Sequence, residues 1–168
     1  MSNTKKAGRR ERLLARKRPT AVYQLAVADD TEAKAELEAA KDALEVAKFR
    51  KDDSAEQAVA DAEERLAAAR EAVEACYEPV TLVAMPPTEF EALIAEHPAR
   101  EGEEEAWNSD TFPRAVFLAC VQSGEDDPTA EEWAELVDRS LSQGERTALL
   151  MAALTVNARW PSGTVPND

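Results

Sequence analysis

A repeating pattern of apolar residues is the clearest feature of the chain. Apolar side chains recur every three or four positions across residues 33–47 and again across 55–76, and charged residues fill most of the positions between them. The repeat consists of Ala33, Leu37, Ala40, Leu44 and Ala47, then Ala55, Val59, Ala62, Leu66, Ala69, Val73 and Cys76. This heptad spacing is typical of helices that pack along a narrow seam. Because only the polar stretch "RKDDS" separates the two segments, the pattern predicts an antiparallel α-helical coiled-coil hairpin over residues 31–77.

Two β-rich stretches flank the hairpin. They are "TAVYQLAVA" at residues 20–28 and "PVTLVAM" at residues 79–85, and each ends in a pair of turn-forming residues. No other stretch has this character, so we expect the two to pair antiparallel. The hairpin would then be an insertion in a two-stranded β-ribbon that spans residues 19–87.

Residues 88–160 predict a small domain of four helices. Each helix has a recognisable start, and together they carry nearly all the large apolar side chains, so we expect the core of the protein here. Capping boxes are expected at Thr88/Glu91, Thr129/Glu132 and Ser142/Glu145, with a further box at Ser54/Gln57 in the hairpin and a cap by Asp110 or Thr111 on the second helix. The predicted fold class is therefore α+β and mostly α, with a flexible tail at residues 161–168.

Charge divides the chain into a basic arm and an acidic body. The net charge is −14, but residues 1–18 hold eight of the 20 basic residues and one acid, Glu11. We expect this arm to be disordered because it has few apolar residues. An acidic body repels nucleic acid and anionic membranes, and it attracts basic partners. Weak, non-specific binding to nucleic acid is therefore expected only through the arm, at Arg9, Arg10, Arg12, Arg16, Lys17 and Arg18.

The sequence gives no sign of a membrane span or a secretory signal. No apolar run approaches the roughly 20 residues that cross a bilayer, and the basic N-terminus lacks a following apolar segment. Cys76 and Cys120 lie in apolar helical patterns, which favours two reduced thiols and a cytoplasmic protein.

His97 is the only histidine and the first candidate for acid–base chemistry, with Glu96 beside it and Asp110 further along the chain. It lies at a predicted helix end before Pro98, where a structural hydrogen bond or a capping role is typical. The chain has no metal-ligand spacing, no G-x-S-x-G motif and no phosphate-binding glycine loop. We therefore expect no enzymatic activity, no metal and no cofactor.

Four aromatic residues are the candidate anchors for a protein partner. The stretch "WNSDTFPRA" predicts a loop-to-helix joint in which an Asx turn precedes the helix, and its aromatic side chains suit docking as well as packing. The candidates are Phe90, Trp107, Phe112 and Trp133, and each position equally suits a buried core.

The order of these motifs resembles a family of small tail proteins from actinobacterial siphophages, often considered tail assembly chaperones. The resemblance covers residues 18–160 and is most specific in residues 86–98 and 107–120, while the basic arm and the length of the hairpin lie outside it. It implies a non-enzymatic protein of the host cytoplasm that binds the helical tape-measure protein, keeps it soluble until tube subunits polymerise, and self-associates. Two alternatives remain open: a structural virion or head–tail component that uses the hairpin as a strut, and a regulatory or nucleic-acid-associated protein that uses the arm.

Overall fold

The computed structural model describes residues 8–158, and the chain divides into two compact units. One unit comprises residues 24–80, and the other comprises the chain before and after them. The described residues form seven α-helices, one π-helix and two strands, so the predicted α+β and mostly helical class is confirmed. Predictions for residues 1–7 and for the tail at 161–168 lie outside the described residues.

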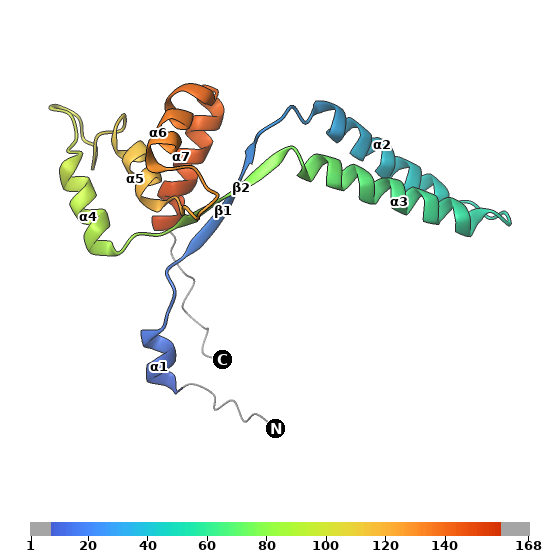
Figure 1. Cartoon of the computed structure of the whole chain (residues 1–168), viewed down its shortest axis with the longest axis horizontal. Coiled ribbons are helices and arrows are strands. Elements are labelled where there is room, and N and C mark those ends of the chain that lie inside the picture. Colours follow the sequence, from blue (N-terminus) through green and yellow to red (C-terminus); the bar gives the residue numbers. More distant parts are fainter. Residues whose placement is uncertain (1–7, 159–168) are drawn as a thin grey trace. The chain divides into compact units, whose positions relative to one another are not determined.

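The two strands form an antiparallel ribbon, as predicted (Figure 1). Strand β1 spans Thr20–Ala26 and strand β2 spans Tyr77–Val83. Backbone hydrogen bonds extend the register beyond both ends: the Val27 N–H donates to the Cys76 carbonyl and the Ala84 N–H donates to the Pro19 carbonyl, each at 2.9 Å. Among the described residues, the outer edge of β2 carries only a short bridge between Leu82 and Val121, so β2 tolerates Pro79 near its start.

Helices α2 (Thr31–Lys48) and α3 (Ala55–Glu74) lie side by side in the unit of residues 24–80 (Figure 1). Their seam is the heptad stripe: Ala40, Leu66 and Ala69 are buried, and Leu37 and Leu44 pack against them. Alanine at seam positions lets the two backbones approach closely but removes little apolar area from water.

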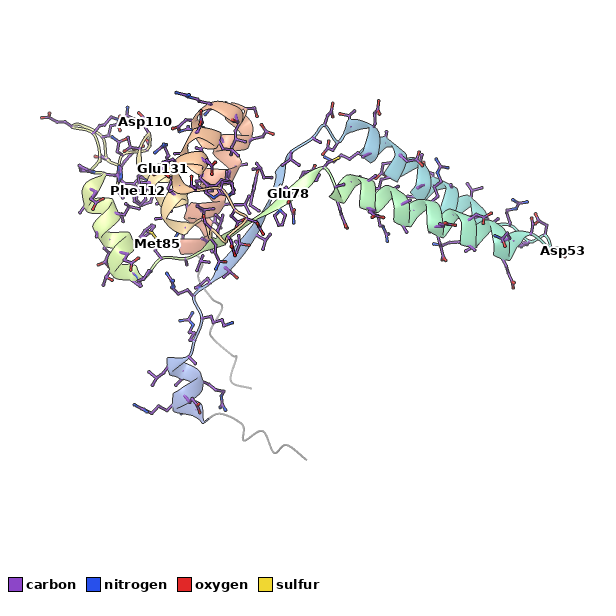
Figure 2. The ribbon with its side chains drawn as sticks, viewed as in Figure 1. Asp53, Glu78, Met85, Asp110, Phe112 and Glu131 are labelled. Carbon is purple, nitrogen blue, oxygen red and sulfur yellow. The ribbon has the colours of Figure 1, made fainter. Side chains whose placement is uncertain are left out.

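The turn of this helix pair differs from the prediction in one respect, the capping box at Ser54 and Gln57. Ser54 is the N-cap residue of α3 but its side chain makes no capping bond. Asp52 accepts both the Ser54 N–H and the Ser54 hydroxyl, and Gln57 donates to Asp61 at 2.6 Å. The predicted box is wrong: Asp52 accepts the Ser54 N–H that Gln57 would have accepted, and the Ser54 hydroxyl oxygen accepts from Arg50 at 3.1 Å instead of from the helix backbone. Asp53 lies beside this turn (Figure 2).

The second unit contains α4 (Pro87–Glu96), α5 (Phe112–Cys120), α6 (Ala130–Glu135), the π-helix η1 (Leu136–Ser140) and α7 (Gln143–Asn157). The sequence predicted one continuous helix where α6 and η1 lie. Its last part widens to i→i+5 bonding, with the Leu141 N–H donating to the Leu136 carbonyl at 3.3 Å. The largest side chains that are fully buried in this unit are Leu82, Phe112, Val116, Phe117, Val137 and Leu149.

Two of the predicted capping boxes in this unit are confirmed. Both Thr129/Glu132 and Ser142/Glu145 make the reciprocal pair of side-chain to backbone bonds. The box at Thr88/Glu91 is wrong, because α4 already begins at Pro87 and its N-cap, Pro86, accepts from the backbone N–H of Phe90. Thr111 is the N-cap of α5, but its side chain makes no capping bond.

Asn157 ties the end of α7 to two other segments of the same unit. Its Oδ1 accepts from the Met85 N–H at 2.8 Å, and its Nδ2 donates to the Ala153 carbonyl at 2.8 Å and lies 3.1 Å from the Cys120 Sγ. Nearby, the Gln122 N–H donates to the Thr81 carbonyl. The Asn157 amide therefore joins the end of α7 to the segment after β2 and to the end of α5. A short β-bridge between Leu82 and Val121 joins β2 to the residue after α5.

The basic arm differs from the prediction of disorder in its described part. Residues Arg9–Leu14 form the short helix α1, none of whose residues is buried. After α1, Arg18 donates to the Ala84 carbonyl at 2.9 Å and so fixes the base of the arm to the helical unit.

Candidate protein-binding surfaces

Three of the four predicted anchors meet in one aromatic cluster. Phe112 is fully buried at the start of α5 (Figure 2), and its ring centroid lies 5.5 Å from that of Phe90 and 4.8 Å from that of Trp107. The His97 ring lies 6.2 Å away on the same cluster. Phe90 and Trp107 are half-buried. Of the three anchors in this cluster, only Phe90 and Trp107 have exposed surface that a partner could contact, because Phe112 is buried in the core.

Trp133 lies apart from this cluster, on α6. It is 6% exposed and packs edge-on against Phe117, with ring centroids 5.8 Å apart. Its Nε1–H is buried and has no hydrogen-bond partner among residues 8–158. The indole is therefore placed as a core side chain.

The loop that carries Trp107 is held by its own polar residues. The Asn108 N–H donates to the His97 carbonyl at 2.9 Å, and the Asn108 Oδ1 accepts from the Asp110 N–H, which is the Asx turn that the sequence predicts. The His97 Nδ1 lies 2.9 Å from the Thr111 hydroxyl, so the imidazole makes a structural hydrogen bond. Arg100 pairs with Asp110 at 3.0 Å.

No metal-binding arrangement accompanies this loop. Within residues 8–158 no three His, Cys, Asp or Glu side chains come close enough together to hold a metal ion. Cys120 is buried in the helical unit, and this burial raises the pKa of its thiol.

A groove that the sequence did not reveal lies at the end of the helix pair that adjoins the turn between α2 and α3. It has a volume of about 410 Å³ and runs between α2 and α3. Four buried or half-buried alanines form its floor, and four exposed side chains form its rim: Ala43, Ala47, Ala58 and Ala62, then Val46, Arg50, Asp61 and Arg65. Val46 is 68% exposed, and Phe49 just beyond it is 80% exposed. One feature of the sequence could have indicated this surface. Val46 and Phe49 are apolar but lie outside the heptad stripe, and positions outside the stripe are normally polar.

Ion pairs fix the rim of this groove. Arg65 donates two hydrogen bonds to Glu36 across the helix pair, at 2.6 and 3.0 Å, and these bonds lower the pKa of Glu36. Arg50 pairs with Asp52 at 3.1 Å. Hydrogen bonds from Ser54 and then from Arg50 lower the pKa of Asp52. Both carboxylates are exposed, so the pairs position the guanidinium groups and add little stability.

A second groove lies in the helical unit, between the start of α5 and α7. Its volume is about 470 Å³, and Pro113, Leu150 and Met151 form its apolar part, with Asp110 and Arg146 among its polar neighbours. Met151 is 53% exposed. Its lining is more polar than that of the groove between α2 and α3, and it includes Ser109 and Asp110 from the loop that carries Trp107.

The six basic residues predicted to contact nucleic acid lie on α1 and the segment after it, and all are exposed. They share this arm with Leu13 and Leu14, which are 63% and 73% exposed. The arm therefore offers apolar contact as well as positive charge.

Comparisons with known proteins add no relative to this picture. The sequence matches no protein-family model, and no curated protein or solved structure is significantly similar to it. Among the described helices, none combines the length and the apolarity needed to cross a bilayer.

Proposed function

We propose that this chain is a non-enzymatic tail assembly chaperone that binds a phage tape-measure protein during tail morphogenesis in the host cytoplasm. The motif order in residues 18–160 suggests the family. The observation that carries the proposal is the groove between α2 and α3, with Val46 and Phe49 exposed beside it. A tape-measure protein is a long, largely helical chain whose apolar stripes must be covered before the tube forms around it.

The groove suits one face of an amphipathic helix. Its alanine floor lets a third helix approach closely, and Val46 and Phe49 offer the larger side chains that anchor such contacts. Val46 and Phe49 are three residues apart at the end of α2, so their exposed side chains are neighbours and offer one apolar surface to a partner. Residues 24–80 hold 16 acidic and seven basic residues, which would keep a complex soluble and separate from other complexes.

We also propose the finer architecture that this function uses. In it, α2 and α3 form a coiled-coil arm, and α4 to α7 with η1 form a four-helix domain that presents Phe90 and Trp107. The arm would supply reach, and the domain a second contact for the same long partner.

Co-expression tests the proposal. The tape-measure protein is produced with and without this chain, and its soluble yield and co-elution with the chain are measured. We expect a soluble complex with the unaltered chain and a large loss of both readouts with Val46→Ser/Phe49→Ser. Val27→Ser is the matched control, because Val27 is 57% exposed and lies outside both grooves.

Equal soluble yield with and without the chain, together with no co-elution, would refute the chaperone function. Recovery of the chain from purified virions at a fixed copy number would instead identify it as a structural component, since a chaperone leaves the finished tail.

A further inference from the structure

Helix α1 has no buried face among the described residues. It has six residues, no side-chain N-cap bond and no buried side chain. A helix this short is unfavourable in water unless it packs against something, because the nucleation cost exceeds the gain from so few hydrogen bonds. Leu13 and Leu14 are 63% and 73% exposed, so α1 has an apolar edge with nothing on it among the described residues. The arm therefore requires a surface to dock on.

Charge indicates what that surface is. Residues 8–18 hold six basic residues and one acid, whereas residues 24–80 hold 16 acids and seven bases. The arm is the one strongly basic segment of a chain whose net charge is −14. Each copy thus carries two oppositely charged surfaces, and the acidic one belongs to the unit of residues 24–80, which contains α2 and α3.

The outer side of α3 is the part of that unit that best matches the arm. Glutamates alternate there with alanines at helical spacing, and all of these residues are exposed: Glu56, Ala60, Glu63, Ala67, Glu71 and Glu74. None of these glutamates forms an ion pair within residues 8–158, where the only α3 ion pair is Arg65–Glu36. The alanines leave shallow gaps between the carboxylates, and these gaps suit branched apolar side chains.

Spacing on α1 fits this surface. Arg9 lies four residues before Leu13, and Arg10 lies four residues before Leu14, so each leucine has a guanidinium one turn away on the same face. A leucine over an alanine gap would bring its arginine towards a carboxylate. This combination of apolar and basic groups suits a protein surface better than a phosphate backbone. The arm also lacks the aromatic residues that stack on bases, and the acidic body repels a polyanion.

We propose that α1 of one copy docks on the outer face of α3 in a second copy. The contact is head-to-tail, because the donor surface and the acceptor surface differ. A heterologous contact of this kind leaves one free arm and one free α3 face on every dimer, so it continues into longer assemblies unless a ring closes. The phage resemblance implies self-association without saying which surfaces meet. The proposal names those surfaces from the charge and exposure of α1 and α3, so it does not rest on binding of a tape-measure protein.

Light scattering after size exclusion tests the contact on the full chain. We expect an average mass at least twice the monomer mass of 18.4 kDa at low salt, rising with protein concentration. It should return to the monomer value when salt is raised from ~20 mM to ~500 mM, because screening shortens the reach of the charges. Arg9→Glu/Arg10→Glu should abolish association. Lys41→Glu/Lys48→Glu makes the same change in net charge on α2 and should preserve it.

Mixing two variants distinguishes a contact between copies from one within a copy. Arg9→Glu/Arg10→Glu keeps α3 intact, and Glu63→Lys/Glu71→Lys keeps the arm intact. Each should be monomeric alone, and the mixture should form a single heterodimer with one functional contact. A monomeric unaltered chain at low salt, or a mixture that stays monomeric, would overturn the proposal. So would arm-dependent binding of a duplex DNA probe without any self-association.

Discussion

Replacing Phe112 with alanine tests the central role that the structure gives to this side chain. Phe112 is fully buried, and its ring contacts those of Phe90, Trp107 and His97. Truncating a buried phenylalanine to alanine costs about 3–5 kcal/mol, from lost burial and the cavity left behind. Loss of the aromatic pairs contributes to this value at about 0.5–1.5 kcal/mol for each. We expect Phe112→Ala to lower the unfolding free energy by an amount near the upper end of this range, since the half-buried rings of Phe90 and Trp107 both lose contact with Phe112.

Tryptophan fluorescence during urea unfolding isolates this effect. Residues 24–80 contain no tryptophan, so the signal comes from the unit that contains Phe112. A loss of 3 kcal/mol or more would lower the melting temperature of a unit of this size by roughly 12 °C or more. Phe112→Leu, which keeps most of the volume, should cost less than about 1.5 kcal/mol.

Phe49→Ala is the matched control for this experiment. Phe49 is 80% exposed, so its truncation should change the unfolding free energy by no more than about 0.5 kcal/mol. The reasoning is refuted if Phe112→Ala costs less than about 1 kcal/mol, or if the Phe49 variant is destabilised as much as the Phe112 variant.

Three further substitutions have definite expected outcomes. Ala40→Leu forces a large side chain into a fully buried seam position, so the helix pair should lose about 1–3 kcal/mol in a far-UV circular dichroism melt. Asn157→Ala leaves the Met85 N–H without its acceptor and should cost about 1–3 kcal/mol by tryptophan fluorescence; an unchanged unfolding midpoint would contradict the proposed tie. Hydrogen bonds from Arg114 lower the pKa of Asp138, so this pair stabilises the fold above the ordinary carboxyl pKa and stops doing so as the pH falls through the lowered value. Asp138→Asn should therefore cost less than about 1 kcal/mol at pH 7, since the pair is partly exposed. The difference from the unaltered chain should begin to shrink below about pH 4 and disappear once the pH is below the lowered pKa of Asp138.

The sequence by itself determined the elements whose signals are local. The heptad stripe places Ala40 and Leu66 in one seam, because helical spacing fixes which side chains share a face. The two β-rich stretches pair as expected, since no other segment competes for them. The boxes at Thr129 and Ser142 form because each needs only residues within one helical turn.

The tertiary structure decided which apolar side chains are buried, which hydrogen bonds form in the turn and where the groove lies, because each depends on residues that pack nearby in space. Phe112 and Phe49 are the same residue type in helical surroundings, yet one is fully buried and the other is 80% exposed. Burial follows from what packs opposite a side chain, and the local sequence does not encode that. Likewise the hydroxyl of Ser54 donates to Asp52 and accepts from Arg50 instead of capping α3, because both partners lie beside it in the turn. The groove beside Val46 arises only when α2 and α3 come together with alanines facing each other, so it belongs to the pair of helices and to neither one alone.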